Sequence, residues 1–257
     1  MDFIIIAVVA FGAAILTFFS GFGLGTILTP VFALFFPVEL AIALTGVVHF
    51  CNGLFKLTLV GKYADKSKLL RFGIPAVIAA FAGAWVLVRI SDIPVLYSYE
   101  WLGKIFEITI VKLVIAVLLI FFALIELLPF FERFQIKKEH LPAGGLLSGF
   151  LGGLSGHQGA FRSAFLVRAG MTKEAFIGTA TVIAVFIDMT RLGVYSTRFL
   201  DAGLQNQVPL ILSATLAAMA GAILGKRLLE KITLDLIQRI VGVLLILIGL
   251  ALGTGLI

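Results

Sequence analysis

Long apolar segments set the first limit on how this chain folds. Six of them approach or reach the roughly 17–25 residues that a helix needs to cross a bilayer, namely 40–60, 70–90, 108–128, 175–195, 208–224 and 236–256. Hydrophobic residues make up 61% of the 257-residue chain and charged residues 13%, against about 45–50% and about 25% in soluble domains. A globular core cannot bury this excess, so the sequence predicts an all-α integral membrane protein.

The basic charge of the chain fits the same class. A net charge of +6 would suggest a nucleic-acid partner for a soluble protein, but in a membrane protein Lys and Arg gather in cytoplasmic loops. We therefore expect a lipid bilayer and a small anion as partners, and no nucleic acid. The single cysteine, Cys51, excludes an intramolecular disulfide. The first apolar segment lacks a basic n-region and is expected to be retained.

Two polar, glycine-rich breaks interrupt the apolar sequence, at 20–26 and 154–168. The arms beside the second break, 144–154 and 160–170, have only 11 residues each, too few for a full span. Polar, irregular backbone at membrane depth is tolerated where it lines a cavity or is buried in protein. Packing between helices is the alternative role for the glycines. The predicted binding site comprises Ser20, Gly23, Gly25, Thr26, Asn52, Ser155, Gly156, His157, Gln158, Gly159 and Arg162.

The two halves of the chain resemble each other. At an offset of 136 residues, Gly23 matches Gly159, Thr45 matches Thr181 and Asn52 matches Asp188. Residues 82–84 also match 220–222, and 116–120 match 242–246. Apolar helices match by chance often, but the polar and glycine coincidences favour an internal duplication.

Loop charge distinguishes two topologies. If each pair of short arms returns to its own side and the N-terminus lies outside, most basic residues fall on the cytoplasmic side. If each pair crosses once, several move outside, including Arg168, Lys173 and Arg227. The returning arrangement fits the positive-inside rule better. It places both termini outside and inverts the two halves relative to each other, as in many transporters.

The predicted organisation is two inverted repeats joined by a cytoplasmic linker. Repeat 1 covers 1–129, with a hairpin at 3–36 and helices at 40–60, 70–90 and 108–128; the linker is 130–142; repeat 2 covers 143–257, with a hairpin at 144–170 and helices at 175–195, 208–224 and 236–256. Residues 91–104, which carry Tyr97, Tyr99 and Trp101, are interpreted as an aromatic belt at the outer interface.

Arg162 is the strongest candidate for an anion contact. It lies one turn into the arm after the second break, and a guanidinium suits sulfite, sulfonate, phosphate or carboxylate oxygens. The alternative is a structural ion pair with Asp188. Asp188 in turn has three open roles: a proton-coupling acid, a clamp for Arg162, or a partner of Arg191 three residues later.

The remaining polar residues have two interpretations each. His157 and Gln158 either donate to the anion or cap the hairpin. Asn52, Thr45 and Thr181 hydrogen-bond either to substrate or to a neighbouring helix. Lys56 is expected to extend to the inner surface, and His49 and His140 have no assigned role.

Enzymatic chemistry has little support in the sequence. The chain contains no H-E-x-x-H, no CxxC and no Walker A motif, so neither a metal nor another cofactor is predicted. Ser155 and His157 lie two residues apart, but no nearby acid orients the histidine. An intramembrane enzyme therefore ranks below transport, and no catalytic residue is assigned.

The glycine motifs resemble those of the TauE/SafE sulfite exporter family over nearly the whole chain. The segment 21–30, Gly-Phe-Gly-Leu-Gly-Thr-Ile-Leu-Thr-Pro, is similar to its glycine-rich, proline-ended motif, and 152–162 occupies the place of the second. The helix pattern also resembles that of the family, including the run Gly178-Thr-Ala-Thr181 that leads into a polar membrane helix. The second motif departs from the pattern: it lacks the terminal proline and carries His157 and Gln158 in place of glycines.

The resemblance implies a multi-pass transporter of the bacterial inner membrane that carries a sulfur-containing anion. Together with the residues, it predicts export of sulfite or an organosulfonate such as sulfoacetate by alternating access, with the anion between the two hairpin tips and proton coupling as an option. An anion channel is the alternative within transport.

Overall fold

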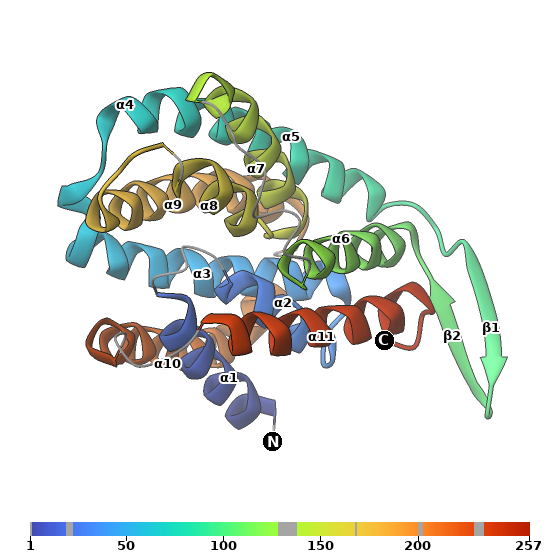
Figure 1. The fold of residues 1–257 in the computed structure, drawn as a ribbon. Coiled ribbons are helices and arrows are strands. Elements are labelled where there is room, and N and C mark those ends of the chain that lie inside the picture. Colours follow the sequence, from blue (N-terminus) through green and yellow to red (C-terminus); the bar gives the residue numbers. More distant parts are fainter. Residues whose placement is uncertain (1, 19–22, 128–137, 168, 200–202, 229–233) are drawn as a thin grey trace.

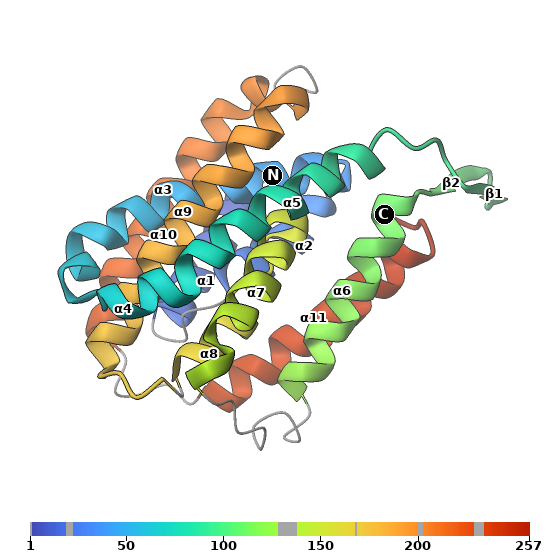
Figure 2. The same ribbon diagram turned by 90° about the horizontal axis from the view of Figure 1, so that it is seen from above.

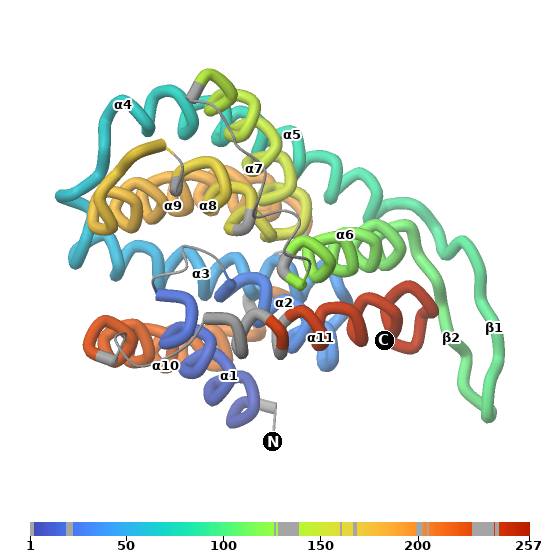
Figure 3. The backbone as a smooth tube through the Cα atoms, in the orientation of Figure 1, coloured from blue at the N-terminus to red at the C-terminus, as the bar shows by residue number. Residues whose placement is uncertain are grey.

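The computed structural model describes residues 2–18, 23–127, 138–167, 169–199, 203–228 and 234–257. The chain is mostly helical (Figures 1 and 3). The helices are α1 (Asp2–Thr17), α2 (Leu24–Ala33), α3 (Val38–Val60), α4 (Lys66–Lys68), α5 (Ile74–Ile90), α6 (Ile110–Leu127), α7 (Leu141–Ser155), α8 (Gly159–Val167), α9 (Lys173–Phe199), α10 (Val208–Leu228) and α11 (Leu234–Gly253). Short turns lie at η1 (Gly61–Tyr63), η4 (Lys138–His140) and η5 (Leu204–Gln207), and a π-helical stretch, η2 (Leu69–Gly73), leads into α5.

Four stretches are long and apolar enough to cross a membrane, within the part of the chain that the structure describes. They are Val38–Tyr63, Lys66–Ile90, Lys173–Arg198 and Val208–Arg227. Large apolar side chains such as Ile78, Phe81 and Leu216 are exposed on these stretches, as expected where lipid rather than water surrounds a helix. The protein is therefore a helical membrane protein.

The helices beside the two breaks are short, and each pair reverses direction. Helices α1 and α2 flank the first break, and α7 and α8 flank the second. Gly156 ends α7 in the left-handed conformation, at φ 82°, a conformation that glycine adopts at little cost. Figure 2 shows α7 running inward from one end of the bundle and α8 returning toward the same end. Helix α7 begins at Leu141, inside the predicted linker, because Pro142 starts a helix readily.

Close glycine contacts pack these arms against helices of the other half. A Cβ atom on Gly149 of α7 would lie 1.9 Å from the carbonyl oxygen of Ala76 in the α5 helix. Similarly, a Cβ atom on Gly83 of α5 would lie 2.0 Å from the carbonyl oxygen of Phe150, and one on Gly221 of α10 would lie 2.3 Å from that of Phe11 in α1. Only glycine permits such close approach of two helix backbones. Gly83 and Gly221, matched by the sequence repeat, thus make equivalent contacts.

A β-hairpin adds two short strands to the expected all-helical chain. Strands β1 (Tyr97–Trp101) and β2 (Lys104–Ile108) pair antiparallel, from Tyr97 opposite Ile108 to Trp101 opposite Lys104. Leu102 and Gly103, both at positive φ, form the two-residue turn that such hairpins favour. The hairpin projects from one end of the bundle (Figure 1), and the Tyr99 hydroxyl donates to the carbonyl oxygen of Thr254 at 2.7 Å. The aromatic residues of the predicted belt thus lie on a hairpin.

The two ends of the bundle carry different sets of basic residues. Figure 2 shows α4, the end of α8 and the start of α9 at one end, and the β-hairpin, the end of α9 and the C-terminus at the other. The first end carries Lys62, Lys66, Lys68, Arg71 and Lys173. At the hairpin end, Arg198 pairs with Asp92 beside the end of α5.

Substituting Gly149 tests the close packing of α7 against α5. Gly149→Ala places a Cβ within 2 Å of backbone that cannot move aside, so we expect a loss of about 1–3 kcal/mol, the usual cost of overpacking. The measurement is thermal unfolding in detergent. Gly193→Ala is the matched control, because no heavy atom lies within 4 Å of that Cβ position. Equal midpoints for the two variants would contradict the packing assigned to Gly149.

Candidate functional site

The two chain breaks meet inside the protein. A Cβ atom on Gly25, in the first turn of α2, would lie 3.2 Å from the carbonyl oxygen of Gly156 and 3.8 Å from Cγ2 of Thr45. Gly23 precedes α2 with φ 117°, which an L side chain rarely adopts. The glycines of both breaks therefore bring the start of α2 against the turn between α7 and α8.

A buried carboxylate, Asp188 of α9, forms the centre of a polar network beside this contact. Its side chain is fully buried. Oδ2 lies 2.5 Å from Nδ1 of His49 on α3. Oδ1 accepts hydrogen bonds from Nε of Arg191 at 2.9 Å and from Nε2 of Gln158 at 3.2 Å. A buried charge is tolerated when it is paired and hydrogen-bonded in this way.

Arg162 joins the network through Gln158. Its Nη1 donates to Oε1 of Gln158 at 2.8 Å, and Gln158 donates in turn to Asp188. The predicted clamp between Arg162 and Asp188 is thus indirect. The predicted pair of Asp188 with Arg191 is present. The Arg191 guanidinium packs against two glycines. A Cβ atom on Gly156 would lie 2.8 Å from Nη1 of Arg191, and a Cβ atom on Gly46 would lie 3.3 Å from its Cζ.

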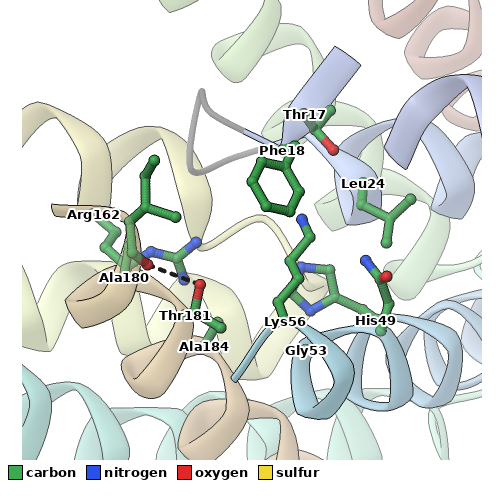
Figure 4. A pocket seen from close by; sticks show the side chains of 12 residues that line it. Thr17, Phe18, Leu24, His49, Gly53, Lys56, Arg162, Ala180, Thr181 and Ala184 are labelled. Atoms are coloured by element: carbon green, nitrogen blue, oxygen red, sulfur yellow. Dashed lines mark hydrogen bonds between the residues drawn. The ribbon is translucent and has the colours of Figure 1, made fainter. Parts of the chain in front are cut away.

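A small cavity opens next to the network, between α3, α8, α9 and the first break (Figure 4). Lys56 and Arg162 reach it from opposite walls. The His49 ring also lines the cavity and contacts Asp188. Asn52 and Thr181 add polar groups, and Oδ1 of Asn52 has no hydrogen-bond partner among the described residues. No carboxylate lines the cavity in the part of the chain that the structure describes. The cavity is therefore cationic, with a volume of about 40 Å³.

The structure brings only part of the predicted site to the cavity. Asn52, Thr181 and Arg162 line it. Five other predicted residues do not line the cavity but belong to the adjoining contacts described above, namely Gly25, Gly156, Gln158, Asp188 and Arg191. Ser20 lies outside the described residues.

The other predicted residues lie away from the cavity lining. Thr26, Thr45 and Gly159 are buried but do not line it. The Ser155 hydroxyl donates to the carbonyl oxygen of Leu151 at 3.0 Å, within its own helix. His157 stacks on Phe122, with ring centroids 5.4 Å apart.

Ser155 and His157 touch, but not as a hydrolytic pair. Nδ1 of His157 lies 3.0 Å from the carbonyl oxygen of Ser155 and 3.2 Å from its hydroxyl. A carbonyl only accepts, so Nδ1 carries the proton and cannot also take one from the hydroxyl. Nε2 of His157 has no partner among the described residues. This pair therefore lacks the geometry of a serine nucleophile with its base.

His49 and Lys56 are the ionisable cavity residues that sequence analysis did not assign to the site. Lys56 faces the cavity rather than the inner surface, with its Nζ 5.2 Å from the centroid of the Phe18 ring. The signal was helical spacing: Thr45, His49, Asn52 and Lys56 follow one another at intervals of four, three and four residues. This spacing places all of them on one face of α3.

The fold and the site together define a helical membrane protein that encloses a small cationic cavity, a class that includes anion transporters. The sequence profile of the sulfite exporter TauE/SafE family matches residues 6–252. The chain therefore belongs to that family, which is a family of membrane transporters for sulfur-containing anions. No curated protein matches the chain.

Removing the Asp188 charge should destabilise the protein strongly. In Asp188→Asn the Arg191 cation loses its buried counter-charge, a change that typically costs about 3–5 kcal/mol. Asp92→Asn is the matched control, because it removes the carboxylate of a half-exposed pair with Arg198, worth about 0.2–1 kcal/mol. Thermal unfolding in detergent compares them. Equal shifts would show that Asp188 is not the main electrostatic support of the site.

Proposed function

We propose that the protein exports sulfite, and that the anion binds in the cavity between Lys56 and Arg162. The observation that carries this proposal is the pair of cations on opposite walls of one cavity, which no carboxylate of the described residues lines. Two positive charges that face one cavity repel each other in a medium of low dielectric constant. A bound anion offsets that repulsion, and a guanidinium presents its donors in a geometry that suits oxyanions.

The cavity size favours a very small anion. On the same measure, roughly 10–15 Å³ holds one water molecule, so about 40 Å³ accommodates about three molecules of that size. Sulfite, with one sulfur and three oxygen atoms, is closer to this size than sulfoacetate, which carries an additional carboxymethyl group. Sulfite is therefore the preferred substrate for this conformation.

The proposed arrangement as two inverted repeats favours transport by alternating access. The most extensive helix contacts pair α5 with α7, α1 with α10, α6 with α11 and α3 with α9. If the halves 1–129 and 143–257 exchange places, the pair α5–α7 becomes the pair α10–α1, and each of the other two pairs becomes itself. The two short hairpins also run inward from opposite ends of the bundle (Figure 2). Because each pair joins one helix of each half, the proposed mechanism is rocking of one group of packed pairs against another around a fixed site.

The charge distribution supports an orientation in the bacterial inner membrane. The end of the bundle with α4 and the start of α9 carries the denser group of basic residues, so we place it in the cytoplasm. The β-hairpin and both termini then lie outside, and the chain crosses the membrane several times. Reporter fusions at the C-terminus and after Lys62 test this orientation.

A channel is the alternative mode of transport. A carrier exchanges labelled for unlabelled sulfite faster than it produces net flux, because the loaded site returns across the membrane. A channel gives currents without such exchange. Counterflow of labelled sulfite in proteoliposomes distinguishes the two, and the proposal predicts counterflow.

Replacing either cavity cation should weaken sulfite transport. Each of Arg162→Ala and Lys56→Met removes a charged donor worth about 1.5–3 kcal/mol, so we expect roughly 10- to 150-fold weaker apparent affinity. Flux of labelled sulfite into proteoliposomes is the measurement, with protein yield and thermal unfolding checked for each variant. Lys62→Met is the control, since that lysine stacks on Tyr63 outside the cavity. Unchanged affinity and flux in Arg162→Ala would overturn the site assignment.

Anion size should decide competition for the site. At equal concentrations, we expect unlabelled sulfite to inhibit flux of labelled sulfite more strongly than sulfoacetate does, because the cavity is small and sulfite is the smaller anion. Equal or stronger inhibition by sulfoacetate would show that the cavity in this conformation does not select the substrate.

A further inference from the structure

His49 connects the anion cavity to the buried carboxylate. Its ring lines the cavity (Figure 4), and its side chain keeps 18% of its surface exposed, whereas Asp188 is fully buried. Nδ1 contacts Oδ2 of Asp188 at 2.5 Å, while Oδ1 is occupied by Arg191 and Gln158. Asp188 is thus held as a fixed counter-charge, and the His49 imidazole connects it to the cavity.

We propose that His49 binds one proton together with the anion, so that each sulfite dianion leaves with one proton and one net negative charge. This inference rests on the proposed function, because it assigns the coupling ion of the same site. It assigns to a histidine the proton-coupling role that the sequence left as one of three for Asp188.

The hydrogen bond to Asp188 sets the chemistry of the ring. A carboxylate accepts, so a neutral imidazole donates its Nδ1–H to Oδ2, and Nε2 keeps the lone pair that takes up a proton. The proton enters from water on the side from which sulfite binds and is released with it on the other side. No covalent bond in the anion changes.

The surrounding charges make the two ligands bind cooperatively. Three cations surround the ring: Lys56 on the same helix, Arg162 from α8 and Arg191 from α9. Among the described residues, Asp188 is the single carboxylate in this network, and α2 contributes the uncharged Leu24 and Gly25. In the empty cavity these cations oppose a proton on His49. A dianion compensates them, so it promotes proton binding, and by linkage the proton promotes anion binding. Because the proton and sulfite bind cooperatively at one site, they cross the membrane in the same direction. Together they carry one net negative charge, so a membrane potential that is negative inside drives their export.

The charge carried per sulfite tests the proposal directly. Proteoliposomes hold labelled sulfite at equal pH on both sides, and the membrane potential is clamped with potassium and valinomycin. The potential that stops net flux should shift by about 59 mV per tenfold sulfite gradient for one net charge, and by about 30 mV for two. We expect about 59 mV for the unmodified protein and about 30 mV for His49→Gln. The control is His140→Gln, which replaces an exposed histidine far along the chain and should also give about 59 mV.

Each outcome has a definite meaning. A shift of about 30 mV in the unmodified protein, or of about 59 mV in His49→Gln, overturns the proton assignment but leaves sulfite transport intact. Absence of sulfite flux in the unmodified protein rejects the proposed function instead. If His49→Gln transports too slowly, calorimetry in buffers of different ionisation enthalpy counts protons taken up on sulfite binding. We expect about one for the unmodified protein and none for His49→Gln, and an unchanged count overturns the assignment.

Discussion

The burial of one carboxylate, Asp188, is the constraint on which the site depends. Its two oxygens bind groups from α3, from α9 and from the turn between α7 and α8. Because an unpaired charge in this environment is costly, these elements must meet at one point. Gln158 then extends the network to Arg162. One buried negative charge thereby fixes the walls of a cavity that is itself positively charged.

Close helix packing makes room for this arrangement. In a bilayer, helices associate through backbone proximity and hydrogen bonds rather than through exclusion of water. Glycines supply that proximity between α5 and α7 and between α1 and α10, while Gly46 and Gly156 leave space for the Arg191 guanidinium. Glycines thus serve both interpretations drawn from the sequence: those within α5, α7 and α10 pack helices, and Gly25 and Gly156 of the breaks shape the polar site. Each of these pairs takes one helix from each repeat, so the proposed movement keeps each packed pair together and moves groups of pairs relative to one another.

The sequence predicted the membrane class, the two breaks and three cavity residues, Asn52, Thr181 and Arg162, because apolar length and polar interruptions are local signals. It missed His49 because that residue's partner lies 139 residues away, and such a contact depends on how helices pack. Lys56 was predicted to face the inner surface because it was judged alone, although its spacing from Asn52 places both on one face. The β-hairpin was missed because its alternating aromatic residues also fit an interfacial belt.

A crystal structure with bound selenite, the selenium analogue of sulfite, tests the central claim most directly, since selenium can be located by anomalous scattering. The account predicts one anomalous peak between the Lys56 ammonium and the Arg162 guanidinium, bordered by Asn52 and His49. A peak at the turn between α7 and α8, beside His157, with none in the cavity would contradict it.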